Sequence, residues 1–396
     1  MSREVDATIS NNASYTTTIP IINHKFKAKE DILKYYARGY KLLNNGIMIA
    51  DKHNMKRAIE NGLYIKALSA YSNQAINDDD ISPCINIEYL NVNHNPSITT
   101  CNPFAESLRK ISVISATLFE CGVADDGLCS CISIENLNAC NNPKITTCEP
   151  FAKSLKILNA KNCCGITDHG LRLCAHIENL DAYDNFKITT CEPFAKSLKI
   201  LNAMHSCGIT DYGLRSCTHI EKLDACNNSK ITTCEPFAPS LRILDASYSC
   251  GISDNGLRLC THIKNLDVCD NPEITTCVPF ATSLQILNAA NTCGITDNGL
   301  RTCISIEKLD MRYNHKITTC APFAKSLRIL KISDVCAITD KGLKLCKSIE
   351  VLDVGDNTKI KSCAPFAKTI RKLIMISTCG ITNAQIKLCP KLVKYM

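Results

Sequence analysis

Apolar residues recur along the chain in a fixed pattern from residue 65 onward. One segment has Ile177, Leu180, Ala182 and Ile188 as its apolar positions, with Asn185 between the last two. Apolar and polar residues alternate around Leu180, and this predicts a short β-strand, because successive side chains of a strand point to opposite faces. The polar residues that follow predict a turn and a connection that returns to the next segment. Each segment is therefore expected to be one strand and one connection.

The same pattern begins again every 21 or 22 residues. Only the step from Leu108 to Ile134 is longer, at 26 residues, which places about four extra residues near 117–120. Since no single segment of this length can bury its own apolar side, we expect the segments to stack into a solenoid. The pattern opens at 15 positions, followed by a partial copy at Leu392: Ile65, Ile87, Leu108, Ile134, Leu155, Ile177, Leu198, Ile220, Leu241, Ile263, Leu284, Ile306, Leu327, Ile349 and Ile370.

The half-repeat L-x-x-L-x-A-x-x-x-C-G-I-T-D-x-G-L-R, at 198–215 and 284–301, resembles the leucine-rich repeats of the cysteine-containing class. Repeats of this class occur in the F-box-type substrate receptors of ubiquitin ligases. The resemblance implies an α/β fold: a horseshoe solenoid with a parallel β-sheet on the concave face and short helical or irregular convex connections. The richness in Asn, Ile and Lys also resembles leucine-rich-repeat arrays of giant DNA viruses.

Three parts of the chain differ in composition. Residues 1–25 are rich in Ser, Thr and Asn, which is typical of a disordered tail. Residues 26–64 carry apolar residues at helical spacing and predict an N-terminal cap over the first repeat; the repeat array is expected over 65–396. The resemblance implies an alternative, in which residues 19–64 bind a ubiquitin-ligase adaptor and the chain is a substrate receptor.

The 27 cysteines follow the repeat period. Twenty-two of them lie in three series whose usual spacing is 43 residues, which indicates small apolar core positions. Members of one series are about 10 Å apart by strand spacing, too far for a disulfide, whereas bridges between series remain open. The Cys-x-His pairs at 174–176, 217–219 and 260–262 are also too far apart to share a zinc ion, so we predict no metal site.

The sequence carries no recognisable targeting signal or catalytic motif. The N-terminal 18 residues hold no apolar stretch typical of a signal peptide, and no run of 18 apolar residues predicts a membrane span, so a cytoplasmic protein is expected. No Walker A loop, GxSxG elbow or HExxH helix is present. The cysteines are repeated equivalents, whereas a nucleophilic cysteine is usually singular and paired with a base. We therefore predict a protein that is not an enzyme and needs no cofactor.

Charge is divided between the two faces of the predicted solenoid. Aspartates occupy the outward strand positions and should make the concave face acidic over the C-terminal two-thirds of the array. Basic residues are phased to the convex side, as at Arg172, Arg215, Arg258, Arg301 and Lys344. The formal charge of +7 is therefore a poor argument for nucleic acid, since no aromatic platform for base stacking accompanies it.

These patterns predict a protein-interaction scaffold that binds a basic or amphipathic protein partner on its concave face. Aromatic and arginine side chains in an otherwise regular polar surface are typical interface anchors, and acidic residues supply the complementary charge. The candidate binding residues are Tyr183, Asp184, His205, Asp224, Asp245, Tyr248, Asp267, Asp270, Arg312 and Tyr313.

Overall fold

The computed structural model describes residues 47–395 except 62, 117–119 and 376–377. The predicted tail (1–25) and the first parts of the predicted cap (26–46) and of the alternative adaptor-binding segment (19–46) lie outside the described residues. The chain divides into two compact units, residues 1–133 and 134–396, which are described separately.

The first unit is a series of parallel strands joined by short helical connections. Each strand pairs in parallel with the next along the chain, from β1 to β4. Its elements are β1 (Met48–Ile49), α2 (Lys52–Glu60), β2 (Ala67–Ser69), α3 (Asp78–Ile81), β3 (Tyr89–Asn91), η1 (Asn102–Phe104), β4 (Lys110–Ser112) and α4 (Asp125–Leu128).

Strand β1 was not predicted from the sequence, which indicated only a helical cap in this region. Helix α2 lies within the segment 26–64 for which we predicted that cap. It begins after Asp51, whose carboxylate accepts a hydrogen bond from the Asn54 backbone, and it ends at Asn61. Met55 and Ala58 are buried on one side of the helix. The described residues before the first predicted repeat therefore supply one further strand to the sheet, together with a helix.

The second unit continues the same architecture with very regular geometry. Each strand is parallel to the next and in register with it, so that the central leucines of β5 to β16 follow one another, as Leu244 follows Leu223. Its strands are β5 (Asn136–Asn138), β6 (Ile157–Asn159), β7 (Asn179–Asp181), β8 (Ile200–Asn202), β9 (Lys222–Asp224), β10 (Ile243–Asp245), β11 (Asn265–Asp267), β12 (Ile286–Asn288), β13 (Lys308–Asp310), β14 (Ile329–Lys331), β15 (Val351–Asp353), β16 (Lys372–Ile374) and β17 (Lys394–Tyr395).

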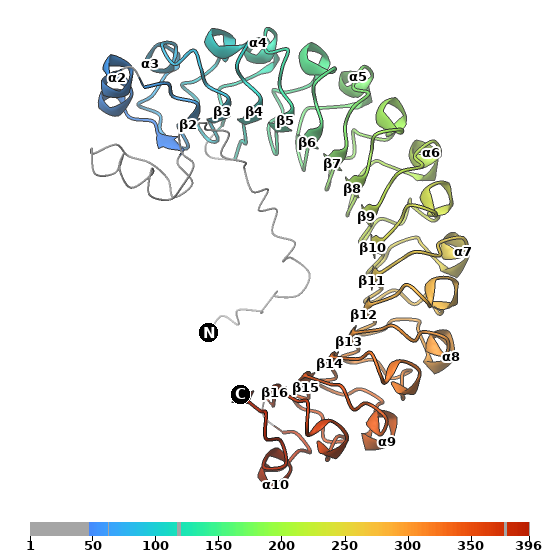
Figure 1. Cartoon of the computed structure of the whole chain (residues 1–396). Coiled ribbons are helices and arrows are strands. Elements are labelled where there is room, and N and C mark those ends of the chain that lie inside the picture. The colour runs from blue at the N-terminus through green and yellow to red at the C-terminus, as the bar shows by residue number, and fades with distance from the viewer. Residues whose placement is uncertain (1–46, 62, 117–119, 376–377, 396) are drawn as a thin grey trace. The chain divides into compact units, whose positions relative to one another are not determined.

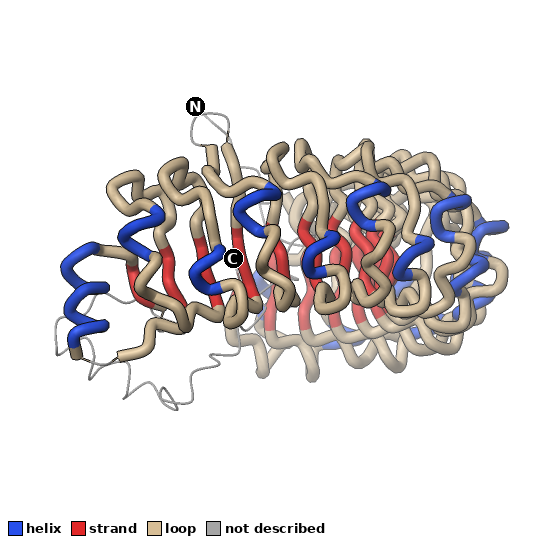
Figure 2. Tube along the Cα trace, turned by 90° about the horizontal axis from the view of Figure 1, so that it is seen from above, coloured by secondary structure: helices blue, strands red, loops and turns tan. Residues whose placement is uncertain are grey.

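Two kinds of connection alternate on the side opposite the strands (Figures 1 and 2). One is a 3₁₀ turn with proline in its first turn and a buried phenylalanine; the other is a single α-helical turn. The 3₁₀ turns are η2 (Glu149–Phe151), η3 (Glu192–Phe194), η4 (Glu235–Phe237), η5 (Val278–Phe280), η6 (Ala321–Phe323) and η7 (Ala364–Phe366). The helical turns are α5 (Asp168–Leu171), α6 (Asp211–Leu214), α7 (Asp254–Leu257), α8 (Asp297–Leu300), α9 (Asp340–Leu343) and α10 (Asn383–Ile386).

A row of buried asparagines ties the turns together. The side chain of Asn228 donates to the Ala203 carbonyl at 2.7 Å and accepts from the Lys230 backbone at 3.0 Å. Buried backbone groups left without partners would cost about 1 to 3 kcal/mol each, so each asparagine stabilises the turn that precedes it as well as its own. The same pattern recurs at Asn95, Asn185, Asn271, Asn314 and Asn357.

The convex helical turns are held by contacts between connections and have no side-chain N-cap at Thr210. Thr210 occupies the N-cap of α6, but its side chain makes no capping hydrogen bond. Instead the Asp211 carboxylate accepts hydrogen bonds from Thr232 and Thr233 of the following connection. A side chain at Gly213 would place Cβ 2.1 Å from the Thr189 carbonyl oxygen, so only glycine permits this close approach.

The cysteines pack as the repeat period predicted. Of the 22 in the three series, only Cys379 is partly exposed. Burial raises the pKa of Cys207 to about 11 and that of Cys164 to about 12, which keeps both thiols protonated. Among the five outside the series, Cys226 is buried, two are partly exposed (Cys140 and Cys269) and two are exposed (Cys129 and Cys163). Most of the thiols thus serve as small core side chains.

The described residues contain neither a membrane-spanning helix nor a cluster of metal ligands. None of their helices is long and apolar enough to cross a membrane. Nor does this part of the chain gather three or more His, Cys, Asp or Glu side chains in a way that could hold a metal ion.

Candidate functional site

Three aspartates form a continuous row across the centre of the concave face. Asp224, Asp245 and Asp267 end the adjacent strands β9, β10 and β11, and the strand register places each beside the next. Neighbouring strands in a sheet are about 4.8 Å apart, so the three carboxylates come from directly adjacent positions. We call these three residues the Asp ladder.

The Asp ladder is electrostatically strained. Burial, and then the neighbouring Asp245 carboxylate, raise the pKa of Asp224 to about 7 and that of Asp267 to about 6. Burial also raises the pKa of Asp245, although hydrogen bonds from Ser247 oppose this effect. Lys222 contributes a partly compensating positive charge to Asp224 and Asp245. The ladder therefore carries negative charge that the protein only partly balances.

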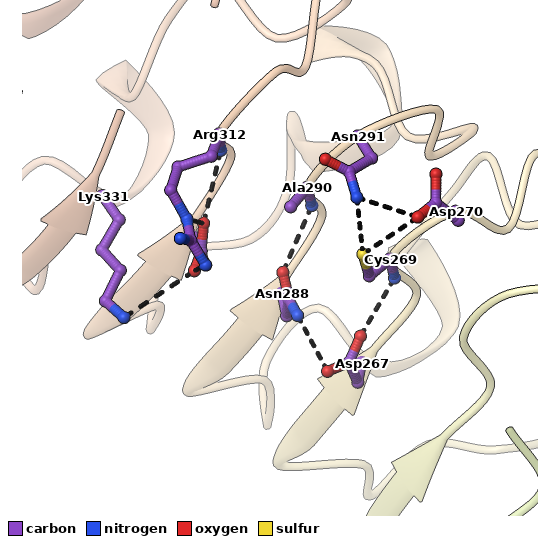
Figure 3. Close-up of polar contacts among 9 residues, drawn as sticks. Asp267, Cys269, Asp270, Asn288, Ala290, Asn291, Arg312 and Lys331 are labelled. Carbon is purple, nitrogen blue, oxygen red and sulfur yellow. Dashed lines mark hydrogen bonds and ion pairs between the residues drawn. The ribbon is translucent and has the colours of Figure 1, made fainter. Parts of the chain in front are cut away.

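Hydrogen bonds from neutral groups hold these carboxylates in place. Asn288 donates to Asp267 at 2.8 Å, as Figure 3 shows, and the Cys269 backbone donates to the same side chain at 3.0 Å. The backbone of Cys226 donates to Asp224 at 3.3 Å. Neutral donors thus fix these side chains in position, while Lys222 supplies the compensating positive charge.

Cations neutralise the aspartate row on either side of the ladder. On one side Lys161 pairs with Asp181 at 2.8 Å. On the other, Arg312 donates two hydrogen bonds to the carboxylate of Asp310, at 3.0 and 2.9 Å, and Lys331 lies 3.9 Å from it (Figure 3). We predicted that all these aspartates would face outward as an acidic surface. Asp181 and Asp310 are in fact buried, because each sits beneath its cation.

The turns after strands β5 to β15 each contain a residue with left-handed backbone geometry. Asparagine and aspartate occupy most of these positions, as expected for residues that tolerate a positive φ. Tyr248 and Tyr313 adopt the same conformation with φ of 56°, which bulky side chains rarely do. Both are exposed. Tyrosine at these positions costs stability that an asparagine would not, and this favours a role on the surface.

The other candidate residues lie in two neighbouring clusters. Tyr183 packs edge to face on His205 with ring centroids 5.0 Å apart, and Lys161 lies over the tyrosine ring. Asp184 is exposed in the turn after Tyr183. These three candidate residues flank the cation at one side of the Asp ladder.

Asp270 belongs to a hydrogen-bonded cluster beside the ladder. Asn291 donates to Asp270 at 2.8 Å and to the Cys269 sulfur at 3.3 Å (Figure 3). Thr292 donates to the same carboxylate. Although burial opposes ionisation, these hydrogen bonds lower the pKa of Asp270. Asp270 is therefore a fixed negative charge, in contrast to the aspartates of the ladder.

Two exposed isoleucines beside the ladder were missed by sequence reasoning. Ile243 and Ile286 begin strands β10 and β12 and are 38% and 36% exposed. Each shares the outward face of the sheet with the residue two positions later in its strand, which is Asp245 in β10 and Asn288 in β12. A strand that reads Ile-Leu-Asp could have indicated this, because only the central leucine can point inward. The centre of the concave face thus combines apolar and acidic side chains.

The comparisons with known proteins concern the fold. No protein-family model and no curated protein matches the sequence. The structure is similar to a leucine-rich-repeat protein of Leptospira interrogans, with a TM-score of 0.56, 17% identity, and coverage of 87% of this chain and 98% of that one. It is also similar to the functional domain of InlJ from Listeria monocytogenes, which includes a cysteine ladder, with a TM-score of 0.51, 14% identity, and coverage of 82% and 78%. The parallel strands, the asparagine row and these two similarities agree: the chain has the leucine-rich-repeat fold.

Proposed function

We propose that the chain is a non-enzymatic interaction scaffold whose concave face, around the Asp ladder, binds a basic amphipathic segment of a protein partner. The observation that carries this proposal is the row of three half-buried carboxylates on adjacent strands, where burial raises the pKa of all three and the charge of Asp245 raises that of Asp224 and Asp267 further. A row of Lys or Arg side chains would relieve that repulsion and add charge-assisted hydrogen bonds.

Apolar contacts would accompany the charges. Ile243 and Ile286 lie beside the ladder, and Tyr248 follows strand β10 in an exposed turn. Apolar and aromatic side chains surrounded by polar ones supply much of the free energy of protein association. A segment that alternates basic and apolar residues would match both rows.

The test is the affinity of the whole chain for a fluorescein-labelled peptide of alternating Lys and Leu, measured by fluorescence anisotropy at low salt. In the variant D224N/D245N/D267N the side chains keep their size but lose their charge. We expect its affinity to fall about tenfold, since each charge contact contributes up to about 1 kcal/mol.

The matched control is E149Q/E192Q/E235Q, which removes three carboxylates from the convex connections. We expect this variant to bind the peptide within about twofold of the unaltered chain, because its changes lie on the opposite side from the ladder. Equal loss in the two variants, or no loss in either, would show that the Asp ladder is not the binding surface.

A further inference from the structure

A row of ion pairs crosses the convex connections of the second unit. The arginine after a helical turn reaches back to the glutamate that begins the preceding 3₁₀ turn, 23 residues earlier. The nitrogen-to-oxygen distances are 3.1 Å for Arg172 with Glu149, 3.4 Å for Arg215 with Glu192, and 3.2 Å for Arg258 with Glu235. In these three repeats a glutamate of the same chain neutralises the charge of each convex arginine.

The acidic members of this row disappear in the following repeats. The positions equivalent to the glutamates hold Val278, Ala321 and Ala364, which begin η5, η6 and η7. The cations are kept as Arg301, Lys344 and Lys387, each directly after a helical turn. The same connection geometry therefore presents cations without their former partners.

Three more lysines lie on the same connections. Together with the cations just described they form what we call the convex cation stripe: Arg301, Lys325, Lys341, Lys344, Lys368 and Lys387. All six are exposed, and none of them makes an ion pair in the described part of the chain.

The aspartates on these connections are already engaged. Asp297 accepts hydrogen bonds from Thr318 and Thr319, and Asp340 accepts them from the backbone of Lys361 and Ser362. Residues 301–396 contain 18 Lys and Arg against seven Asp and Glu, whereas the whole chain has 45 against 38. Excess positive charge is thus concentrated at this end of the chain.

Apolar side chains are interleaved with these cations. Leu345 follows Lys344 and Leu388 follows Lys387, and the two leucines are 57% and 52% exposed. Exposed leucines add nothing to contacts with a phosphate backbone. Because the stripe consists of lysine and arginine alone, it offers no aromatic ring on which a base could stack. A polypeptide that carries both carboxylates and apolar side chains matches the stripe better than a nucleic acid does.

We infer that the convex cation stripe is a second interaction surface, which binds an acidic polypeptide segment whose Asp or Glu residues alternate with apolar residues. The carboxylates of that segment replace the glutamates that the earlier repeats supply from within the chain. This surface lies on the connections, opposite the strands that carry the Asp ladder, and it does not depend on the function proposed for the ladder.

The experiment measures binding of a fluorescein-labelled peptide of alternating Glu and Leu to the whole chain. We expect K325S/K344S/K368S to weaken binding about tenfold, and L345S/L388S to weaken it severalfold without changing its salt dependence. Circular dichroism verifies that each variant is folded.

The matched control is R172S/R215S/R258S, which removes three cations that are already paired with glutamates. It should bind the acidic peptide within about twofold of the unaltered chain. Equal loss in the control and the lysine variant would overturn the inference, as would no measurable binding of the peptide. Capture of a DNA duplex or of phosphatidylserine vesicles through the same lysines, without capture of the peptide, would assign the stripe to a different partner and would also overturn it.

Discussion

Replacing Phe237 by alanine is expected to lower the free energy of unfolding by about 3 to 5 kcal/mol. The Phe237 ring is fully buried in turn η4. An equivalent buried phenylalanine occupies each of the other 3₁₀ turns, which alternate with the helical turns. Removing it leaves a cavity between stacked repeats that the regular backbone cannot close easily. Urea denaturation followed by circular dichroism would measure the change in the transition midpoint.

The matched control is Phe186→Ala. Phe186 lies outside the core and is 66% exposed, so its removal should change the free energy of unfolding by less than about 0.5 kcal/mol. If Phe237→Ala were equally mild, the phenylalanine row would not be the core of the convex side, and the packing described for the second unit would be wrong.

A second large effect is expected from pH. The pKa of Asp224 is about 7 and that of Asp267 about 6 in the folded protein, both above the ordinary value of 3.8. Between about pH 4 and 7 the folded chain therefore keeps protons that the unfolded chain has released. The contribution of these two carboxyl groups to stability must therefore fall as pH rises through this range, by several kcal/mol.

Denaturation midpoints measured from pH 5 to 8 would test this expectation. In D224N/D245N/D267N the fall should largely vanish, because asparagine does not titrate, and the variant should be more stable than the unaltered chain at pH 8. E149Q/E192Q/E235Q should retain the fall. A midpoint that rises with pH in the unaltered chain, or an unchanged slope in the asparagine variant, would contradict the raised pKa values.

The same titration should affect binding with the opposite sign. A cationic segment favours the ionised form of Asp224, so its binding releases protons and its affinity should increase from pH 6 to 8. The scaffold would thus lose stability and gain affinity over the same range. Both trends follow from the raised pKa values of the ladder, which burial and the neighbouring carboxylate on the adjacent strand produce.

Much of this fold could be predicted from the sequence because the repeat itself carries the information. The spacing of Leu180 and Ala182 gave the strand phase, and both side chains are buried as that phase requires. Most of the cysteines are buried because their period matches that of the core. Strand β1 escaped prediction because a strand of two residues carries no recognisable alternation.

The candidate site was predictable only in part. The sequence placed Asp224, Asp245 and Asp267 on one face. It did not show that their pKa values would be raised, because the shifts depend on strand register and on depth in the surface. It also could not show that Arg312 would fold back onto Asp310, since that contact depends on the geometry of the turn. The convex pairs between residues 23 apart were missed for the same reason.

The most direct test of the central claim is a hydrogen–deuterium exchange footprint of the whole chain with and without the Lys/Leu peptide. The account predicts slower amide exchange in the concave segments 222–228, 243–249 and 265–271, and no such footprint in D224N/D245N/D267N. Protection confined to the convex connections, or the same footprint in the variant, would contradict the assignment of the Asp ladder as the binding surface.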